Sequence, residues 1–237
     1  MKQQRILPKI DVHTHILPNV DDGSISFADS MCLLKDCVDN GVTDVILTPH
    51  YRAKYKLDAQ ELKDAFIEFS EQVKNEGLAI RLYLGQEIFA DRHVKELVTS
   101  AKVLPLADSK YLLVEFDFVS DTDIVETVYE LKRLGYNVIV AHIERYTYAD
   151  LNTAFAVKDA GGLIQVNSNA IVGKNRGGDK KKVKELFKAG LVDFVASDVH
   201  VGREYTMEKA YQYVAKKFGE GVALDVFYNN AKKILEG

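Results

Sequence analysis

Two histidines near the start of the chain are the residues best placed to do chemistry. His13 and His15 are separated by one residue within the segment IDVHTH at 10–15. Alternate side chains of a β-strand point to the same face, so both imidazoles are expected on one side of a strand. Imidazole is a common metal ligand, and two converging imidazoles favour a divalent metal ion.

The same arrangement recurs along the chain, because polar residues stand where apolar, strand-like runs end. The run at 193–196 is followed by Asp198 and His200, again separated by one residue. The sixth histidine, His93, opens a helical segment instead and is expected to be a cap or surface residue. The other polar residues at or just after strand ends are Asp22, His50, Glu87, Glu115 and His142.

These residues form a set of nine candidate ligands with only nitrogen and oxygen donors. Four carboxylates packed together repel one another, and their pKa values rise unless metal charge compensates. Nine ligands exceed what one ion can take, so two or three divalent ions that share a bridging carboxylate are expected. A mixed set without thiolate fits manganese, iron or zinc and does not choose among them. Cys32 and Cys37 lack a metal-binding or phosphate-cradling context and are expected to be small core residues.

Two arginines follow the predicted ligands on the same rim. Arg145 follows His142 by three residues, and Arg203 follows His200 by three. A planar guanidinium suits bidentate capture of a pair of phosphate oxygens. The alternative is a structural ion pair with a nearby carboxylate such as Glu144. Arg52 is a weaker third candidate.

The elements that must position these residues alternate regularly between strands and helices. Strands are predicted at 9–13, 44–47, 80–84, 111–115, 137–141, 163–166 and 193–196. Helices are predicted at 27–40, 59–75, 123–134, 151–160 and 181–189. This alternation predicts a parallel sheet, and seven units without a nucleotide-binding glycine fingerprint favour a closed or nearly closed barrel. We expect one domain over 1–237, with a mobile loop at 174–182.

Composition excludes several classes of function. The chain has 237 residues, of which 47% are hydrophobic and 28% charged, as in an ordinary globular protein. A net charge of −4 gives no general attraction to nucleic acid or anionic lipid. No apolar stretch approaches the roughly 20 residues that span a bilayer. The first residues show no signal-peptide hydrophobic region, so a cytoplasmic location is expected.

The motifs resemble those of the PHP (polymerase and histidinol phosphatase) superfamily of metal-dependent phosphoesterases. The chain is most similar to the bacterial tyrosine-protein phosphatase branch of the CpsB/CapC/YwqE type. The resemblance runs from residue 10 to about 233, and departs from the family around 51–56 and at 1–8. It rests on DVHTH at 11–15, VDDG at 20–23, TPH at 48–50, GQEI at 85–88, LVEF at 113–116, AHIERY at 141–146, QVNS at 165–168 and ASDVH at 196–200.

The resemblance implies an α/β fold, a distorted (β/α)7 TIM-like barrel of the PHP type, with a trinuclear metal cluster. Mn²⁺ is the expected ion, with iron or zinc as alternatives. The family's phosphate-binding arginines would correspond to Arg145 and to Arg203. Transferred residue by residue, the first ion would be held by His13, His15, Glu87 and Asp198. The second would be held by Glu87, Glu115 and His142, with Glu87 bridging, and the third by Asp22, His50 and His200.

The expected activity is hydrolysis of phosphotyrosine monoesters by a metal-bound hydroxide, in the regulation of capsule or exopolysaccharide synthesis. Asp198 is a candidate proton donor for poorer leaving groups. The expected partner is a tyrosine-phosphorylated protein, in particular a bacterial tyrosine autokinase, and homo-oligomerisation is left open. Two alternatives stand beside this reading. One is a PHP phosphoesterase acting on a small substrate such as histidinol phosphate or a nucleotide, and the other is a non-catalytic phosphotyrosine-binding regulator.

Overall fold

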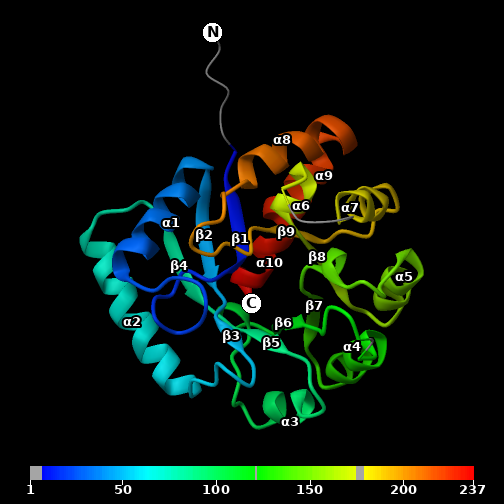
Figure 1. Ribbon diagram of the computed structural model, residues 1–237, viewed down its shortest axis with the longest axis horizontal. Coiled ribbons are helices and arrows are strands. Elements are labelled where there is room, and N and C mark those ends of the chain that lie inside the picture. The colour runs from blue at the N-terminus through cyan, green and yellow to red at the C-terminus, as the bar shows by residue number, and fades with distance from the viewer. Residues whose placement is uncertain (1–6, 121, 175–178) are drawn as a thin grey trace.

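Nine short parallel strands form the centre of the computed structural model, which describes residues 7–120, 122–174 and 179–237 (Figure 1). Every strand pairing in it is parallel, as the predicted alternation requires. The first sheet has the order β1 (Lys9–Thr14), β2 (Val42–Leu47), β4 (Arg81–Leu84). The second has the order β3 (His50–Tyr51), β5 (Glu87–Phe89), β6 (Tyr111–Glu115), β7 (Asn137–Val140), β8 (Leu163–Asn167), β9 (Phe194–Ala196).

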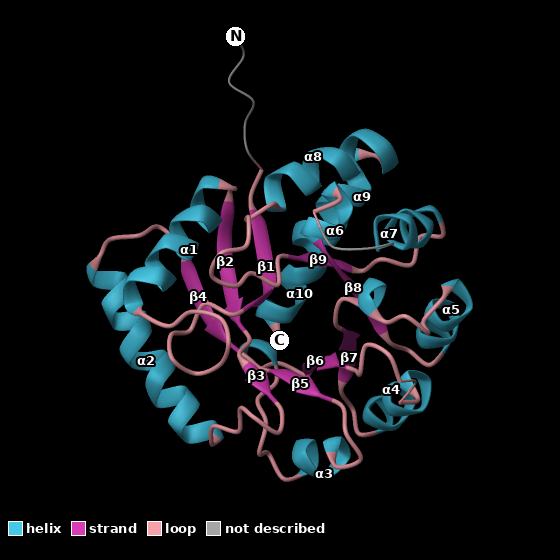
Figure 2. Ribbon diagram, viewed as in Figure 1, coloured by secondary structure: helices cyan, strands magenta, loops and turns pink. Residues whose placement is uncertain are grey.

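Helices surround these strands, as Figure 2 shows. Parallel neighbours need a crossover that returns the chain to the same end of the sheet, and helices supply most of these returns. The first five helices are α1 (Phe27–Asp39), α2 (Ala59–Asn75), α3 (Val94–Thr99), α4 (Ile124–Arg133) and α5 (Leu151–Asp159). Those that follow are α6 (Ser168–Val172), α7 (Asp179–Lys188), α8 (Met207–Phe218), α9 (Glu220–Leu224) and α10 (Asn230–Glu236).

The predicted α/β fold with parallel strands is confirmed, and the predicted helices are found within two residues of their expected ends. The sequence did not predict β3 and β5, which continue β2 and β4 after an interruption. Pro49 lies in the first gap and has no N–H to donate to a ladder. Gly85 lies in the second, where an added Cβ would sit 2.7 Å from the side chain of Leu106. Both sequence features explain why the strand lines break there.

The first strand also meets the segment that follows the last strand. Thr14 and Val199 form a parallel bridge, and the His15 N–H donates to the carbonyl of Val199 at 3.1 Å. The Asp198 N–H donates to the carbonyl of His13 at 2.9 Å. Residues from the two ends of the strand order are therefore joined through their main chains, beside the predicted ligands.

The strands and α10 enclose a second, smaller apolar core besides the large one under the outer helices. Ile10, Ile46, Leu113 and Ile139 are each at most 2% exposed, and Ile234 of α10 packs against the same cluster. Burial of such side chains is the main stabilising term of the fold. This apolar filling lies among the strands, whereas the predicted ligands stand at or beyond the strand ends.

Some sequence expectations fall partly outside the described residues. Residues 175–178 of the predicted loop at 174–182 are outside them, while 179–182 belong to α7. Residues 1–6 of the N-terminal extension are also outside them. Among the described residues, none of the helices combines the length and apolar character needed to cross a bilayer.

A buried tyrosine braces the ends of β6 and β7. Tyr146 is fully buried, and its hydroxyl donates to the carbonyl of Ala141 at 2.7 Å. The same hydroxyl accepts a hydrogen bond from the Phe116 N–H at 3.1 Å. One side chain thus satisfies two main-chain groups that the ends of β6 and β7 would otherwise leave unpaired.

We expect Tyr146→Phe to lower the free energy of unfolding by about 1–3 kcal/mol, because two buried main-chain groups lose their partner. Denaturant-induced unfolding of wild type and variant measures the loss. Tyr129→Phe is the control, since Tyr129 is 47% exposed and its hydroxyl has no hydrogen bond among the described residues. Equal unfolding free energies for the two variants would show that the brace contributes little.

Candidate metal centre

All nine predicted ligands lie together, most of them at or just after the carboxyl ends of strands, while His50 and Glu87 are the first residues of β3 and β5. They fall into four overlapping groups, and within each group the potential ligand atoms lie within 4.8 Å of one another. Eight of the nine residues are buried, and Asp22 is the exposed one. The groups are His15, Asp22, His50 and His200; His13, Glu87 and His142; His13, His15 and Asp198; and His50, Glu87 and Glu115.

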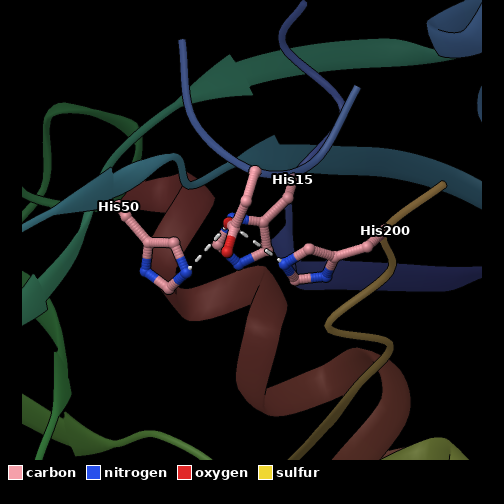
Figure 3. A group of neighbouring side chains, drawn as sticks. His15, His50 and His200 are labelled. Carbon is pink, nitrogen blue, oxygen red and sulfur yellow. Dashed lines mark ion pairs between the residues drawn. The ribbon is translucent and has the colours of Figure 1, made fainter. Parts of the chain in front are cut away.

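The first group brings together three segments that are far apart in the sequence. His15, His50 and His200 turn their rings toward one another in Figure 3. Asp22 lies 3.4 Å from His50 Nε2 and 3.5 Å from His200 Nε2. The ring centroids of His15 and His200 are 4.2 Å apart in a stacked arrangement. Asp22 is 43% exposed while the three histidines are buried, so this group reaches the solvent at Asp22.

A close approach by a glycine makes this geometry possible. The loop after β1 folds back on His15, so that an added Cβ on Gly23 would stand 2.0 Å from the His15 carbonyl oxygen. The Ser24 N–H donates to that carbonyl at 3.1 Å. Any larger residue at 23 would push the loop, and Asp22 with it, away from the imidazoles.

The Nε2 nitrogens of His13 and His15 face each other beside the carboxylates of Glu87 and Asp198. Their Nε2 atoms are 3.2 Å apart. The Nδ1–H of His15 donates to Asp21 at 2.6 Å, and that of His13 donates to Gln165 at 3.2 Å. In this tautomer both Nε2 atoms carry lone pairs, and two lone pairs at this distance repel unless a proton or a cation lies between them. The arrangement fits a shared metal ion.

Glu87 stands at the middle of the site. Its carboxylate oxygens lie 2.7 Å from His50 Nδ1 and 2.8 Å from His142 Nε2. They lie 3.3 Å from His13 Nε2 and 3.4 Å from His15 Nε2. No other side chain of the centre contacts four of the imidazoles so closely, among the residues that the structure describes.

The electrostatics of the centre are those of a site that needs positive charge. Burial, followed by the charge of Glu87, raises the pKa of Glu115 to about 8. Burial also opposes ionisation of Glu87, yet the imidazoles around it, His13 first, hold its pKa well below the usual range. In the protein alone the compensating charge comes from His13 and His15, where burial opposes protonation but neighbouring carboxylates raise the pKa values. A divalent cation would supply it more fully.

A second observation also indicates that this set of donors suits divalent metal ions. Among the described residues, four buried atoms at the centre make no hydrogen bond of acceptable geometry. His50 Nδ1 and Glu87 Oε2 are only 2.7 Å apart, yet they are not aligned for a hydrogen bond. Burying a polar atom without a hydrogen-bond partner costs free energy, so metal ligation is the better explanation of these atoms. The four atoms are His50 Nδ1, Glu87 Oε2, Glu115 Oε2 and His142 Nδ1.

Two of the candidate ligands have an unusual backbone. His142 has φ 31° and Asp198 has φ 50°, both in the left-handed region that residues other than glycine rarely adopt. Each stands just after the end of a strand, β7 and β9 respectively. Such strain clusters at functional sites, where the surrounding structure maintains it.

The sequence reasoning missed an orienting carboxylate, Asp21. Besides accepting the Nδ1–H of His15, it accepts the main-chain N–H of His50 at 3.0 Å and that of Gly23 at 2.9 Å. Burial opposes its ionisation, but His15 and these donors lower its pKa to about 2. A carboxylate behind a metal-binding imidazole fixes the ring and raises its basicity. The signal was present, because Asp21 stands beside Asp22 in the segment VDDG.

The sequence reasoning also missed two side-chain amides, those of Gln165 and Asn167, which are hydrogen-bonded in series. Asn167 donates from Nδ2 to Asp198 at 2.9 Å, so its oxygen faces Gln165 and accepts from Gln165 Nε2 at 2.7 Å. The Gln165 oxygen is then left to accept from the main-chain N–H of His142 at 2.8 Å and from His13 Nδ1–H at 3.2 Å. The polar residues at 165 and 167, alternating in a buried strand, were the available signal.

Three arginines surround the candidate ligands, as the sequence suggested. Arg145 Nη1 donates to Asp198 at 3.2 Å, and its guanidinium lies 4.2 Å from the centre of the Phe118 ring. Arg203 Nη1 donates to the carbonyl of Asp198 at 3.1 Å. Arg52 lies 3.3 Å from Asp22 and 3.6 Å from Glu115. Each side chain is about one third exposed or more, so anions from solvent can reach all three guanidinium groups.

The residues left out of the site are accounted for. His93 precedes α3, bonds to Arg92 and is 52% exposed, so it is a surface residue as expected. Cys37 is buried, and burial raises the pKa of its thiol well above the usual value. The prediction for Cys32 was wrong, because its side chain is exposed on the outer face of α1.

Comparisons with known proteins agree with this geometry. A family model described as "Capsular polysaccharide synthesis, CpsB/CapC" matches residues 9–236. The tyrosine-protein phosphatase CpsB of Streptococcus pneumoniae is 30% identical over 95% of this chain and 98% of its own length. The tyrosine-protein phosphatase YwqE of Bacillus subtilis is 31% identical over 89% of this chain and 85% of its own.

The fold agrees with a solved structure as well. Crystal structures of YwqE from Bacillus subtilis and CpsB from Streptococcus pneumoniae, described as unique metal-dependent tyrosine phosphatases, match with a TM-score of 0.90. Identity there is 29%, with 96% of this chain and 94% of that chain covered. With the family model spanning nearly all of its length, this chain belongs to the CpsB/CapC family of capsular polysaccharide synthesis.

Proposed function

We propose that this chain is a metal-dependent protein-tyrosine phosphatase that hydrolyses phosphotyrosine monoesters in the control of capsule or exopolysaccharide synthesis. The observation that carries the proposal is the convergence of nine nitrogen and oxygen ligands beneath three partly exposed arginines. Cations and guanidinium groups together match the charge of a phosphomonoester. The names and metal dependence of the relatives support tyrosine phosphate as the substrate class.

The groups of side chains suggest how up to three divalent ions would be shared. His13, His15 and Asp198 would hold one ion, with Glu87 beside them. Glu87 would also hold the second ion, and the third would lie on the solvent side. The second ion would take Glu87, Glu115 and His142, and the third Asp22, His50 and His200 with His15 adjacent. Mn²⁺ is the ion we favour, with iron or zinc as alternatives.

Bound divalent ions would supply the attacking hydroxide at neutral pH and neutralise charge on the phosphate. The protein's part is to bind and orient the ester. Arg145 is suited to this role because the Phe118 ring supports one face of its guanidinium and Asp198 holds one nitrogen. Its other N–H groups donate to no group among the described residues, so they can bind phosphate oxygens. Arg203 approaches the same carboxylate from the other loop and would be the second phosphate contact.

Asp198 is better suited to hold cations than to donate a proton. Burial opposes its ionisation, yet the surrounding imidazoles, His13 first, lower its pKa. A group that remains ionised is a poor general acid. A phenolate leaving group, as in phosphotyrosine, needs protonation less than an alkoxide does, which fits the proposed substrate.

Further features remain proposals. We expect the two sheets to act as one distorted (β/α)7 barrel of the PHP type within a single domain over 1–237, because β3 and β5 continue β2 and β4 and Thr14 bridges to Val199. A tyrosine-phosphorylated protein, in particular a bacterial tyrosine autokinase, is the proposed partner. Cytoplasmic location and homo-oligomerisation stay predictions.

The activity should depend on metal and not on cysteine. We expect a strong chelator to abolish hydrolysis of a phosphotyrosine peptide and Mn²⁺ to restore it, while Cys32→Ser and Cys37→Ser leave the rate within about twofold of wild type. Assays on histidinol phosphate and a nucleotide, run in parallel, should give much lower kcat/KM. Full activity of metal-free protein, or inactivation by either serine, would contradict the metal mechanism. A preference for a small substrate would favour the alternative phosphoesterase.

Glu87→Ala should remove more metal than the loss of a ligand at the edge of the site. Two ions would lose a shared carboxylate, and their mutual repulsion would then be unscreened. Elemental analysis of folded protein gives metal per chain, and Asp22→Ala is the comparison because Asp22 belongs to one group only. Equal metal content in Glu87→Ala and wild type would reject the bridging role.

Arg145→Ala should lower kcat/KM by about 30- to 1000-fold, since a charge-assisted bidentate contact that strengthens in the transition state is worth roughly 2–4 kcal/mol. Arg145→Lys should recover only part of the loss, because an ammonium keeps the charge without the fork. Steady-state kinetics and a melting curve are measured on the same samples. A lower melting temperature with near-normal kinetics would assign Arg145 a structural role instead.

A further inference from the structure

A second pocket opens beside the metal centre. Its volume is about 450 Å³, which is in the range of small-ligand sites. Tyr51 and Phe89 provide its aromatic walls, and Arg52, Lys56 and Lys102 provide its positive charge. In Figure 1 the strands β3 and β5 lie between the middle of the molecule and α3, which is at its lower edge. We call this hollow the flanking pocket.

Two of its cations have no counter-ion. Neither Lys56 nor Lys102 forms an ion pair or side-chain hydrogen bond with any residue that the structure describes. Lys56 directly follows a tight turn, in which Arg52 and Tyr55 exchange main-chain hydrogen bonds at 3.0 and 2.8 Å. Both ammonium groups therefore remain available to an anion that enters the pocket.

The two acidic residues of the pocket, Asp91 and Glu96, both lie beside His93. Asp91 accepts the main-chain N–H of His93 at 2.8 Å, at the start of α3. Glu96 lies 3.6 Å from the imidazole of the same histidine. Neither carboxylate forms an ion pair with Lys56 or Lys102, and the three cations that line the pocket, Arg52, Lys56 and Lys102, outnumber its two carboxylates.

The flanking pocket and the metal centre share a wall. Arg52 lines the pocket and also lies 3.3 Å from Asp22 and 3.6 Å from Glu115. Phe89 is two residues from Glu87 on β5 and pairs with Glu115 in the parallel register. A ligand held at the metal centre can thus extend directly into the pocket.

We propose that the flanking pocket binds an acidic side chain of the substrate polypeptide close to its phosphotyrosine. The proposal rests on the proposed function and adds a substrate class to it, namely phosphotyrosine with a nearby aspartate or glutamate. The carboxylate would lie between Lys56 and Lys102, and the stem of the side chain would pack on Tyr51 and Phe89. A free small phosphomonoester cannot use this contact, because it has no flanking chain.

The test compares peptides that differ by one charge. Glutamate and glutamine are placed in turn at each of the two positions on either side of phosphotyrosine, and kcat/KM is measured for each pair. Exposed ion pairs are individually weak, so wild type should prefer glutamate about two- to tenfold at one or two positions. The preference should shrink as ionic strength rises. Lys56→Gln/Lys102→Gln should bring the ratio close to one without changing hydrolysis of a small aryl phosphate.

A binding measurement separates this inference from the chemistry. Fluorescence anisotropy with the same peptides, carrying a non-hydrolysable difluorophosphonate in place of the phosphate, should give the same ratio of Kd values. Lys35→Gln/Lys217→Gln is the matched control, because both lysines are exposed and lie outside the pocket. Peptides hydrolysed or bound without a charge preference, or a preference that survives in the pocket variant, would overturn the inference and leave the proposed function standing. If the proposed function is wrong, no peptide will be hydrolysed in a metal-dependent way. The ratio of Kd values from anisotropy would still show whether the flanking pocket prefers an acidic side chain.

Discussion

Buried like charges are the constraint on which the rest of this structure depends. Glu87, Glu115 and Asp198 lie close together with little exposure, and their mutual repulsion has to be balanced by positive charge. In the protein alone the balance comes from the imidazoles, which lower the pKa of Glu87 and Asp198. Glu115 is not compensated in this way, because burial and then the charge of Glu87 raise its pKa to about 8. Divalent cations are the economical way to satisfy such a set, in which four buried nitrogen and oxygen atoms have no hydrogen-bond partner among the described residues.

Residues behind the candidate ligands hold the ligand side chains in one orientation. Asp21 and Gln165 bind the Nδ1 atoms of two imidazoles, so that their Nε2 atoms are turned to the centre. Asn167 determines the orientation of Gln165, because it must itself donate to Asp198. The direction of every hydrogen bond in this chain is therefore set by one ionised carboxylate. Preorganisation of this kind lets ligands bind cations without rearrangement, at the expense of strained backbone at two of them.

The breaks in two strand lines place the candidate metal centre next to the flanking pocket. Because β2 and β4 stop and resume as β3 and β5, His50 and Glu87 pair with each other at the start of the new strands. The residues that follow, Tyr51 and Phe89, then belong to the adjoining flanking pocket. A continuous strand would have placed the ligands and the pocket wall differently, since each residue of a regular strand alternates its face.

The sequence by itself determined the parallel α/β class, the spans of five helices and the whole set of candidate ligands, because all of these are local signals. Apolar runs ending in His13, Glu115 or His142 reveal strand ends, and the carboxyl ends of parallel strands must meet. Only the tertiary structure decided how the candidate ligands are grouped, since Glu87 approaches imidazoles from three separate segments, at 13–15, 50 and 142. It alone revealed the orienting role of Asp21, because a carboxylate that binds a metal and one that binds the back of an imidazole are identical in sequence. Contacts between residues distant along the chain depend on strand order and twist, which no local pattern contains.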